Sequence, residues 1–275
     1  MGARIAHRLL NAGNDLVVWN RDATKTEPLV DEGAGVAATP AEAARHAEVV
    51  ITMVTDPAAL AAVTEGPNGV AAGAGEGTTV VQMSTVAPPA TARLASALPA
   101  GSQLLDAPVL GSRSEAETGT LTIFAGGPQE LVDRLAPVLT ALGTVLHVGP
   151  LGAGTSAKLV ANTTLVGVIG VLGEALALAE GLGLSGESAF DVLGVTPLAA
   201  QAKRRRAAFE SGSYPPRFTL SLALKDADLI LEAAAASKLD LRLVEAARSW
   251  LAEADEAGAG DHDYSAVLGR IAPGS

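Results

Sequence analysis

Two polar side chains interrupt a long apolar stretch of the chain, and their spacing suits catalysis. Lys158 stands directly before residues 159–173, and Asn162 is the amide within them. Asn162 lies four positions after Lys158, so on a helix both side chains lie on one face. A lysine can supply positive charge and a proton to a carbonyl oxygen on which negative charge develops, and burial lowers the pKa of such an amine. Because a lone charge beside an apolar helix is costly unless it lines a cleft, the pair is a candidate for a catalytic acid and a positioning amide.

Each residue of this pair also has a structural interpretation. Lys158 could extend its charged end from a helix terminus to water, and Asn162 could be a buried amide with satisfied hydrogen bonds. The stretch falls short of the ~20 residues of a bilayer span, and Lys158 and Glu174 close its ends. We therefore expect a core helix and no membrane contact.

A second candidate site follows a short β-branched run at residues 15–19. Asn20 and Arg21 come next, and Lys25 lies in the following turn. Where such a strand meets a dinucleotide, an acid binds the ribose 2′-hydroxyl, whereas an arginine accommodates a 2′-phosphate. Asn20 has no charge to repel a phosphate, and both basic side chains can pair with one, so the pattern favours NADP(H) over NAD(H). Taken alone, Arg21 would by default be a solvated residue at a helix start.

The elements that must position these residues alternate in the first half of the chain. Short β-branched runs predict strands, and Ala-rich stretches with helical spacing lie between most of them. The strands are predicted at residues 15–19, 48–54, 78–83, 103–109, 120–125 and 144–148. Such alternation predicts parallel strands joined by crossover helices.

The second half of the chain reads differently, because no strand is predicted after residues 149–152. Helices are predicted at residues 154–182, 187–193, 197–210, 219–236 and 240–256. We therefore expect an α/β fold in which a doubly wound parallel (Rossmann) sheet, residues 1–151, precedes an all-helical domain, residues 152–275.

The chain opens on a helix where a dinucleotide fold would open on a strand. Residues 2–10 read as the first helix, and a strand with a glycine-rich turn normally precedes it, so that backbone N–H groups hold the pyrophosphate. Met1 and Gly2 match the end of such a turn. We expect the first strand to be absent and this sequence to be a shortened version of a longer chain.

Composition excludes several classes of site and partner. The absence of cysteine excludes disulfides, thiolate zinc sites and cysteine nucleophiles. The four histidines share no ligand spacing and residues 261–263 read as a polar loop, so no metal is expected. A net charge of −11 argues against nucleic acid as a partner. The basic run at residues 203–206 reads as a solvated helix face, and no export signal is evident, so a cytoplasmic protein is expected.

Several short motifs in a fixed order give the chain a family resemblance. They are Asn20-Arg21, Met53-Val54-Thr55-Asp56-Pro57, Ser84-Thr85-Val86, Asp106-Ala107-Pro108-Val109, Gly119-Thr120-Leu121, Gly152-Ala153-Gly154 with Lys158 and Asn162, and Lys225-Asp226. In this order they resemble the β-hydroxyacid dehydrogenase family, which includes 3-hydroxyisobutyrate dehydrogenase. Gly111-Ser112-Arg113 and Phe218 bring the chain nearest to the glyoxylate/succinic semialdehyde reductase branch.

The resemblance implies a role for each matching position. Lys158 matches the family's catalytic lysine, and Asn162 matches its substrate-binding asparagine. The positions that match contacts to the nicotinamide cofactor are Met53, Val54, Thr55, Thr85 and Lys225, while Phe218 and Asp226 line the same site. Thr85 could also simply cap the helix that follows it. The helical domain is implied to join the subunits of a homodimer or a higher homo-oligomer.

One departure from the family lies in the segment that binds the substrate carboxylate. Leu110 stands where the family usually has a serine whose hydroxyl helps in that binding. The backbone N–H groups of Gly111 and Ser112, with the Ser112 hydroxyl, remain for this role.

The function expected from these residues is hydride transfer between NADP(H) and a small substrate. We expect an oxidoreductase that interconverts a small aldehyde or semialdehyde acid with its hydroxy acid, with Lys158 as general acid and base. Two alternatives stay open: an imine-type reductase on the same fold, which the loss of serine at Leu110 permits, and a catalytically silent NADP-binding dimeric scaffold.

Overall fold

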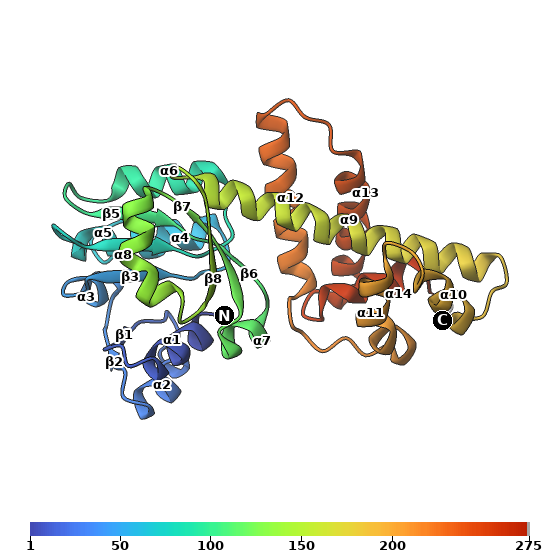
Figure 1. Ribbon diagram of the computed structural model, residues 1–275, viewed down its shortest axis with the longest axis horizontal. Coiled ribbons are helices and arrows are strands. Elements are labelled where there is room, and N and C mark those ends of the chain that lie inside the picture. Colours follow the sequence, from blue (N-terminus) through green and yellow to red (C-terminus); the bar gives the residue numbers. More distant parts are fainter. Residues whose placement is uncertain (274–275) are drawn as a thin grey trace. The chain divides into compact units, whose positions relative to one another are not determined.

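The computed structural model describes residues 1–273. They form two compact units, of which the first is Met1–Leu159 and the second begins at Val160. The division falls inside helix α9 (Ala153–Gly181), which starts in the first unit and continues into the second (Figure 1). The helical domain expected from the sequence extends to residue 275, and its last two residues, Gly274 and Ser275, lie outside the described residues.

A mixed sheet forms the centre of the first unit. Its strands are β3 (Val49–Thr52), β4 (Thr79–Gln82), β5 (Gln103–Asp106), β6 (Val109–Leu110), β7 (Leu121–Gly126) and β8 (Gly143–Gly149). The order is β3-β4-β5-β7-β6, and β8 also pairs with β7. Strands β3, β4 and β5 are parallel, whereas β7 runs antiparallel to β5 and β6 and parallel to β8. All four residues of β4 are buried, as expected for a strand covered on both faces.

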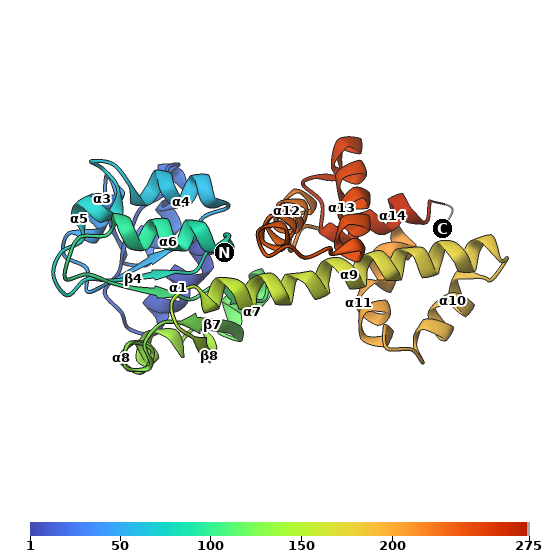
Figure 2. The same cartoon turned by 90° about the horizontal axis from the view of Figure 1, so that it is seen from above.

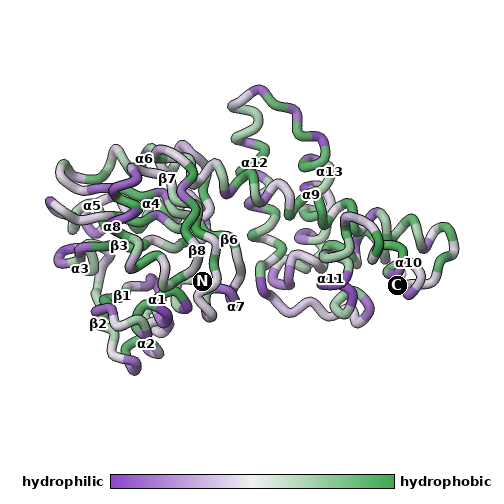
Figure 3. The backbone as a smooth tube through the Cα atoms, in the orientation of Figure 1, coloured by the Kyte–Doolittle hydropathy of each residue, from purple (hydrophilic) through white to green (hydrophobic). Residues whose placement is uncertain are grey.

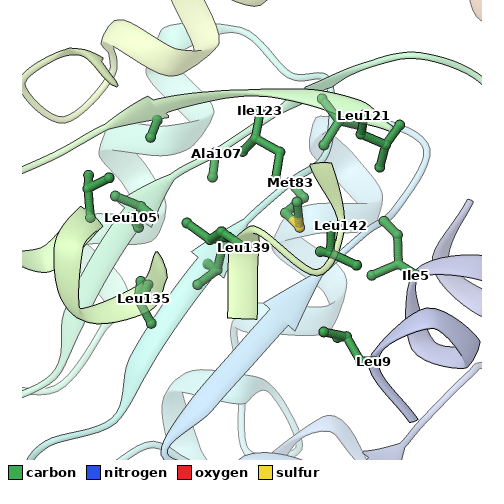
Figure 4. Packing of buried hydrophobic residues seen from close by; sticks show 14 of the residues in the cluster. Ile5, Leu9, Met83, Leu105, Ala107, Leu121, Ile123, Leu135, Leu139 and Leu142 are labelled. Carbon is green, nitrogen blue, oxygen red and sulfur yellow. The ribbon is translucent and has the colours of Figure 1, made fainter. Parts of the chain in front are cut away.

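Helices cover both faces of this sheet (Figure 2). They are α1 (Gly2–Asn11), α3 (Pro40–Ala44), α4 (Pro57–Thr64), α5 (Val70–Gly73), α6 (Pro88–Ala97), α7 (Arg113–Thr118) and α8 (Gln129–Leu139). Helix α2 (Glu27–Asp31) contacts α1 instead. Side chains alternate across a strand, so Val80 and Leu104 pack against α3 to α6, whereas Val81 and Leu105 pack against α1 and α8. Figure 4 shows the second of these clusters, with Ile5 of α1 beside Leu142, which directly precedes β8.

A separate pair of strands completes the first unit. Strands β1 (Val17–Val18) and β2 (Gly35–Val36) are parallel to each other and form a sheet of their own. Among the described residues, neither strand is hydrogen-bonded to β3, so the strand layer is interrupted between β1 and β3. Strand β2 was not predicted, because Val36 is a single β-branched residue among glycines and alanines and forms no run.

The second unit is helical. Besides most of α9 it contains α10 (Gly186–Leu193), α11 (Ala199–Ser211), α12 (Leu220–Ala236), α13 (Arg242–Ala254) and α14 (Val267–Ile271), with a π-turn at Asp255–Ala259 and a 3-10 turn at Tyr264–Ala266. Each helix predicted after residue 152 has its counterpart here. The expected fold class, a doubly wound α/β sheet followed by a helical domain, is therefore confirmed, although the sheet is mixed.

Helix α9 is long and apolar enough to cross a membrane by length and composition, and no other described helix is. A core helix of a soluble protein passes the same test, and half of the most apolar window of α9 is buried inside the protein.

Two expectations from the sequence hold only in part in the second unit, because one charged side chain of each segment is buried while Lys203, Arg204, Asp261 and His262 are exposed. Residues 203–206 form a hydrophilic part of α11 (Figure 3), but Arg205 within this run is buried. Asp263, expected in a polar loop, is buried as well, and its Oδ1 lies 3.0 Å from Nη1 of Arg205. The ion pair gives each buried charge a partner, which offsets part of the cost of removing both side chains from water.

Candidate active site

The start of helix α1 and the loop after β3 lie together in the first unit. A Cβ on Gly2 would lie 3.8 Å from Cβ of Met53. Met1 is the N-cap of α1 and makes no side-chain capping bond. The first N–H groups of a helix have no partner within it, so this terminus offers donors and a positive dipole end to a phosphate group.

The loops after β3 and β4 are tied to each other at the carboxyl edge of the sheet. The backbone N–H of Val54 donates to Oγ of Ser84 over 2.9 Å. Thr85 follows and is half-buried, but it is not a helix cap, because α6 has Ala87 as its N-cap. Thr52 ends β3, and its buried hydroxyl has no hydrogen-bond partner among the described residues. Ligands of doubly wound sheets bind at this edge.

The residues expected at the adenosine ribose follow β1. Asn20 and Arg21 are both exposed, and Oδ1 of Asn20 accepts the N–H of Asp22 over 3.0 Å. Lys25 folds back towards Asp22, with 3.7 Å between Nζ and Oδ2. A hydrogen bond from Thr24 is the main cause that lowers the pKa of Asp22. Arg21 therefore presents its guanidinium to solvent, whereas Lys25 shares its charge with a carboxylate.

The hydrogen-bond donors of Ser112, in the turn between β6 and α7, are already bonded within the chain, which was not expected from the sequence. Gly111 has a φ of 136°, and a Cβ there would lie 2.7 Å from Cδ2 of Leu121, so only glycine fits. Ser112 caps α7, and its N–H and hydroxyl both donate to Oε2 of Glu115, over 2.7 and 2.5 Å. These bonds, led by that from the Ser112 hydroxyl, lower the pKa of Glu115 to about 2. The two groups of Ser112 expected to bind substrate are thus engaged by an internal carboxylate.

Lys158 lies in the second turn of α9 and is 7% exposed. The first turn of that helix is bound to the sheet by Asp106, whose carboxylate accepts both the N–H and the hydroxyl of Thr155 over 2.6 Å. Asn162, one helical turn beyond Lys158, is also buried. The two candidate catalytic side chains therefore share one face of a helix, as their spacing predicts.

In the second unit, Asn162 is bound to the pair Lys225-Asp226 of α12. Its Nδ2 donates to Oδ2 of Asp226 over 2.6 Å, and Nζ of Lys225 lies 2.6 Å from Oδ1 of the same carboxylate. Oδ1 of Asn162 is buried and has no hydrogen-bond partner among the described residues. The amide is thus oriented by Asp226, and its carbonyl oxygen is available as an acceptor.

Phe218 lies just before α12 and is held through its backbone. Its N–H donates to Oδ2 of Asp263 over 3.3 Å, and its ring makes an edge contact with Tyr264, with 5.5 Å between centroids. Arg205 completes this cluster, because its guanidinium lies 4.6 Å from the centre of the Tyr264 ring.

Comparison with known proteins assigns the family. Residues 1–150 match the NAD binding domain of 6-phosphogluconate dehydrogenase, and residues 152–271 match the NAD-binding domain of NADP-dependent 3-hydroxyisobutyrate dehydrogenase. The chain belongs to the β-hydroxyacid dehydrogenase family. It is accordingly a pyridine-nucleotide-dependent oxidoreductase that acts on CH–OH groups.

Individual relatives in this family cover almost the whole chain. The 3-sulfolactaldehyde reductase of Escherichia coli (strain K12) is 35% identical over 98% of this chain and 92% of its own length. Glyoxylate/succinic semialdehyde reductase 1 of Arabidopsis thaliana is 31% identical over 98% of this chain and 94% of its own. The solved structure of Mycobacterium tuberculosis 3-hydroxyisobutyrate dehydrogenase with L-serine superposes with a TM-score of 0.85 at 28% identity, over 98% of this chain and 95% of that one.

The residues present fit a pyridine nucleotide. The terminus of α1 faces the Met53 loop, the orphaned Thr52 hydroxyl lies at the ligand-binding edge of the sheet, and Arg21 is exposed after β1. No cluster of His, Cys, Asp or Glu suited to a metal ion occurs among the residues that the structure describes.

Several residues of these sites were given no role from the sequence. Glu115 was recognisable, because Ser112 and Glu115 have the S-x-x-E spacing of a capping box. Asp106 and Asp263 carry no comparable local signal, because their partners lie 49 and 58 residues away along the chain.

Proposed function

We propose that this chain is an NADP(H)-dependent reductase that interconverts a small aldehyde or semialdehyde acid and its hydroxy acid, with Lys158 as the general acid and base. The observation that carries the proposal is the burial of Lys158 and Asn162 on one face of α9. A buried charge one turn from a buried amide is costly unless a substrate or another polar group meets it.

The bound cofactor supplies the hydride, and the residues of the chain manage the carbonyl oxygen. Lys158 donates a proton to that oxygen as negative charge develops on it. Asn162 positions the substrate through the amide that Asp226 orients, and its unpartnered Oδ1 accepts a hydroxyl hydrogen. In the reverse direction Lys158 takes the proton from the alcohol.

The preference for NADP(H) rests on Arg21. Its exposed guanidinium can pair with a 2′-phosphate through two hydrogen bonds. Lys25 contributes less, because Asp22 already holds its ammonium group. A charge-assisted hydrogen bond contributes about 1.5–3 kcal/mol, so two bonds from Arg21 favour NADPH by about a hundredfold or more.

The substrate carboxylate is proposed to bind at Gly111 and Ser112. It competes there with Glu115 for the donors of Ser112. We therefore expect Glu115→Ala to lower KM for glyoxylate, and an unchanged KM to exclude this turn as the carboxylate site.

The assembled state is proposed to be a homodimer or a higher homo-oligomer. Apolar side chains of the second unit are exposed in one chain, among them Leu178 at 64%, Leu182 at 70% and Val195 at 88%. Burying them against a second copy would remove this surface from water. Light scattering after gel filtration measures the mass, and a monomer would overturn this point.

The experiment that tests the reaction is turnover with a panel of aldehydes. NADPH oxidation is measured with glyoxylate, succinic semialdehyde and methylmalonate semialdehyde, for the wild type, Lys158→Ala and the control Lys203→Ala, which alters an exposed lysine. We expect Lys158→Ala to keep less than about a tenth of the wild-type rate, because a general acid contributes about 10²–10⁴-fold. Binding of NADPH, followed by tryptophan fluorescence, should change little.

Other outcomes separate the alternatives. More than a tenth of the activity in Lys158→Ala contradicts the acid role. Turnover of imines alone indicates an imine reductase, and binding of NADPH without turnover of any substrate indicates a silent scaffold.

The cofactor preference has its own test. We measure kcat/KM with NADPH and NADH for the wild type, Arg21→Ala and Arg45→Ala, an exposed arginine elsewhere in the first unit. Arg21→Ala should lose efficiency with NADPH alone. Equal efficiency of the wild type with both cofactors, or an equal loss for both in Arg21→Ala, would refute the assignment.

A further inference from the structure

We propose that Asp106 is a positioning residue, which holds the first turn of α9 and thereby sets the place of Lys158. This inference rests on the proposed role of Lys158 and adds a residue that the chemistry itself does not use. Asp106 ends strand β5 and is fully buried, with a relative exposure of 0%.

The carboxylate of Asp106 takes the place of a missing helix cap. The residue before α9 is Gly152, which has no side chain to accept an N–H of the first turn. Oδ2 of Asp106 accepts the N–H of Thr155 instead, and Oδ1 accepts its hydroxyl, both over 2.6 Å. The hydroxyls of Thr155 and Thr91 are 3.0 Å apart, and all three side chains are buried. A carboxylate at a helix N-terminus is also favoured by the helix dipole.

Two glycines allow the helix to approach the strand ends closely. A Cβ on Gly154 would lie 2.3 Å from the carbonyl oxygen of Asp106 and 2.4 Å from that of Phe124. A Cβ on Gly126 would lie 2.5 Å from the backbone nitrogen of Gly154. The first turn of α9 is therefore in contact with the ends of β5 and β7, and hydrogen bonds as well as packing determine its position.

The carboxylate is retained there at a cost. Burial is the main cause that raises the pKa of Asp106, while the bonds from the Thr155 hydroxyl and N–H oppose it. A capping threonine or asparagine would supply an acceptor without this desolvation. Because it accepts two bonds from Thr155, the buried carboxylate holds the helix in one direction and one rotation.

The position of this turn is passed directly to the catalytic lysine. Thr155 and Lys158 are three residues apart and lie on the same side of the helix, and Asn162 follows one turn later. A misplacement of about 1 Å in a reacting group can cost about 10²-fold in rate. Loss of the bonds at Thr155 should therefore lower kcat more than it weakens substrate binding.

The test uses variants that alter the network to different degrees. Thr155→Val removes the hydroxyl and keeps the bond from the N–H, Thr155→Ser restores the hydroxyl, and Asp106→Asn removes the charge. Thr140→Val is the control, because that hydroxyl donates to a carbonyl within α8. Measured quantities are kcat, KM, the dissociation constant for NADPH and the melting temperature.

We expect Thr155→Val and Asp106→Asn to lower kcat by at least about tenfold with KM and NADPH binding changed less than threefold, and Thr155→Ser to recover most of kcat. In a Lys158→Ala background, Thr155→Val should cause no further loss of the residual rate, because it acts through that lysine. A merely structural role would lower the residual rate by the same factor.

Unchanged kcat in Thr155→Val and Asp106→Asn, or equal losses in both backgrounds, would overturn the proposal. If Asp106→Asn fails to fold, the Thr155 variants decide, since they retain the buried carboxylate. Failure of the proposed function is seen separately, as an active Lys158→Ala, as turnover of imines alone, or as no turnover by the wild type. An inactive Lys158→Ala with a fully active Thr155→Val refutes only the role of Asp106.

Discussion

The two partners of the buried ion pair between Arg205 and Asp263 should differ strongly in how much stability is lost when each is substituted. Asp263→Ala leaves the guanidinium of Arg205 buried without its carboxylate, and it removes the acceptor for the backbone N–H groups of Arg217 and Phe218. Arg205→Met leaves Asp263 with those two donors and with the N–H and hydroxyl of Ser265. We expect the first substitution to be much the more damaging.

The magnitude follows from what each variant leaves unsatisfied. Removing one partner of a buried ion pair costs about 3–5 kcal/mol, so we expect about 4 kcal/mol for Asp263→Ala. Arg205→Met should cost about half as much, because methionine fills similar space and Nε of Arg205 has no hydrogen-bond partner among the described residues. The free energy of unfolding of a domain is about 5–15 kcal/mol in all, so the loss expected for Asp263→Ala is severe.

Urea unfolding of both variants measures these differences. Fluorescence of Trp250, in a Trp19→Phe background, reports on the second unit, and Asp261→Ala is the control, because that exposed carboxylate is two residues from Asp263. KM for the substrate should also rise in Asp263→Ala, since the segment of Phe218 loses its anchor. Equal losses of stability in Arg205→Met and Asp263→Ala would refute the reasoning.

Three further predictions concern stability. Lys238 has a φ of 57° just after α12, and the N–H of Leu239 donates to the carbonyl of Ala234 over 2.9 Å. Because glycine adopts this conformation more readily, Lys238→Gly should raise the free energy of unfolding by about 0.5–1 kcal/mol. A lower melting temperature would contradict this. The pKa of Glu115 is lowered from its ordinary value of 4.5 to about 2, so the contribution of this carboxylate to stability is present above pH 4.5 and is lost as pH falls towards 2. The free energies of unfolding of the wild type and Glu115→Gln should therefore differ at neutral pH and converge in acid. Gly154→Ala should lower the free energy of unfolding by about 1–3 kcal/mol. Gly181→Ala on the same helix should not lower it, because a Cβ there meets nothing within 4 Å. Equal melting temperatures for these two variants would exclude the close approach of α9 to the strand ends.

Much of the fold could be predicted because it depends on local patterns. The strand centred on Val80 and Val81 is a short β-branched run, and its two residues face opposite sides of the sheet as the period of two requires. Helix α9 could be placed to within one residue at each end from its apolar composition alone. The antiparallel direction of β7 was missed, because direction depends on which strand lies beside it and not on its own residues.

Lys158 and Asn162 show how far the sequence alone determined the candidate site. Their shared face follows from four residues of spacing on one helix, and burial of both agrees with the apolar residues around them. Helical periodicity acts over a few residues, so the pattern that predicts it is contained in the sequence. The same holds for Arg21, whose place after β1 follows from chain order.

Only the tertiary structure decided which charges are buried and what they hold. Asp106 caps a helix that begins 47 residues later. Arg205 lies in a basic run that was expected to be solvated, yet it is buried and paired with Asp263. The cost of burying such a charge is decided by its partner, and packing of distant segments chooses that partner. A single stretch of sequence contains one member of each pair, whereas the folded chain brings both members together.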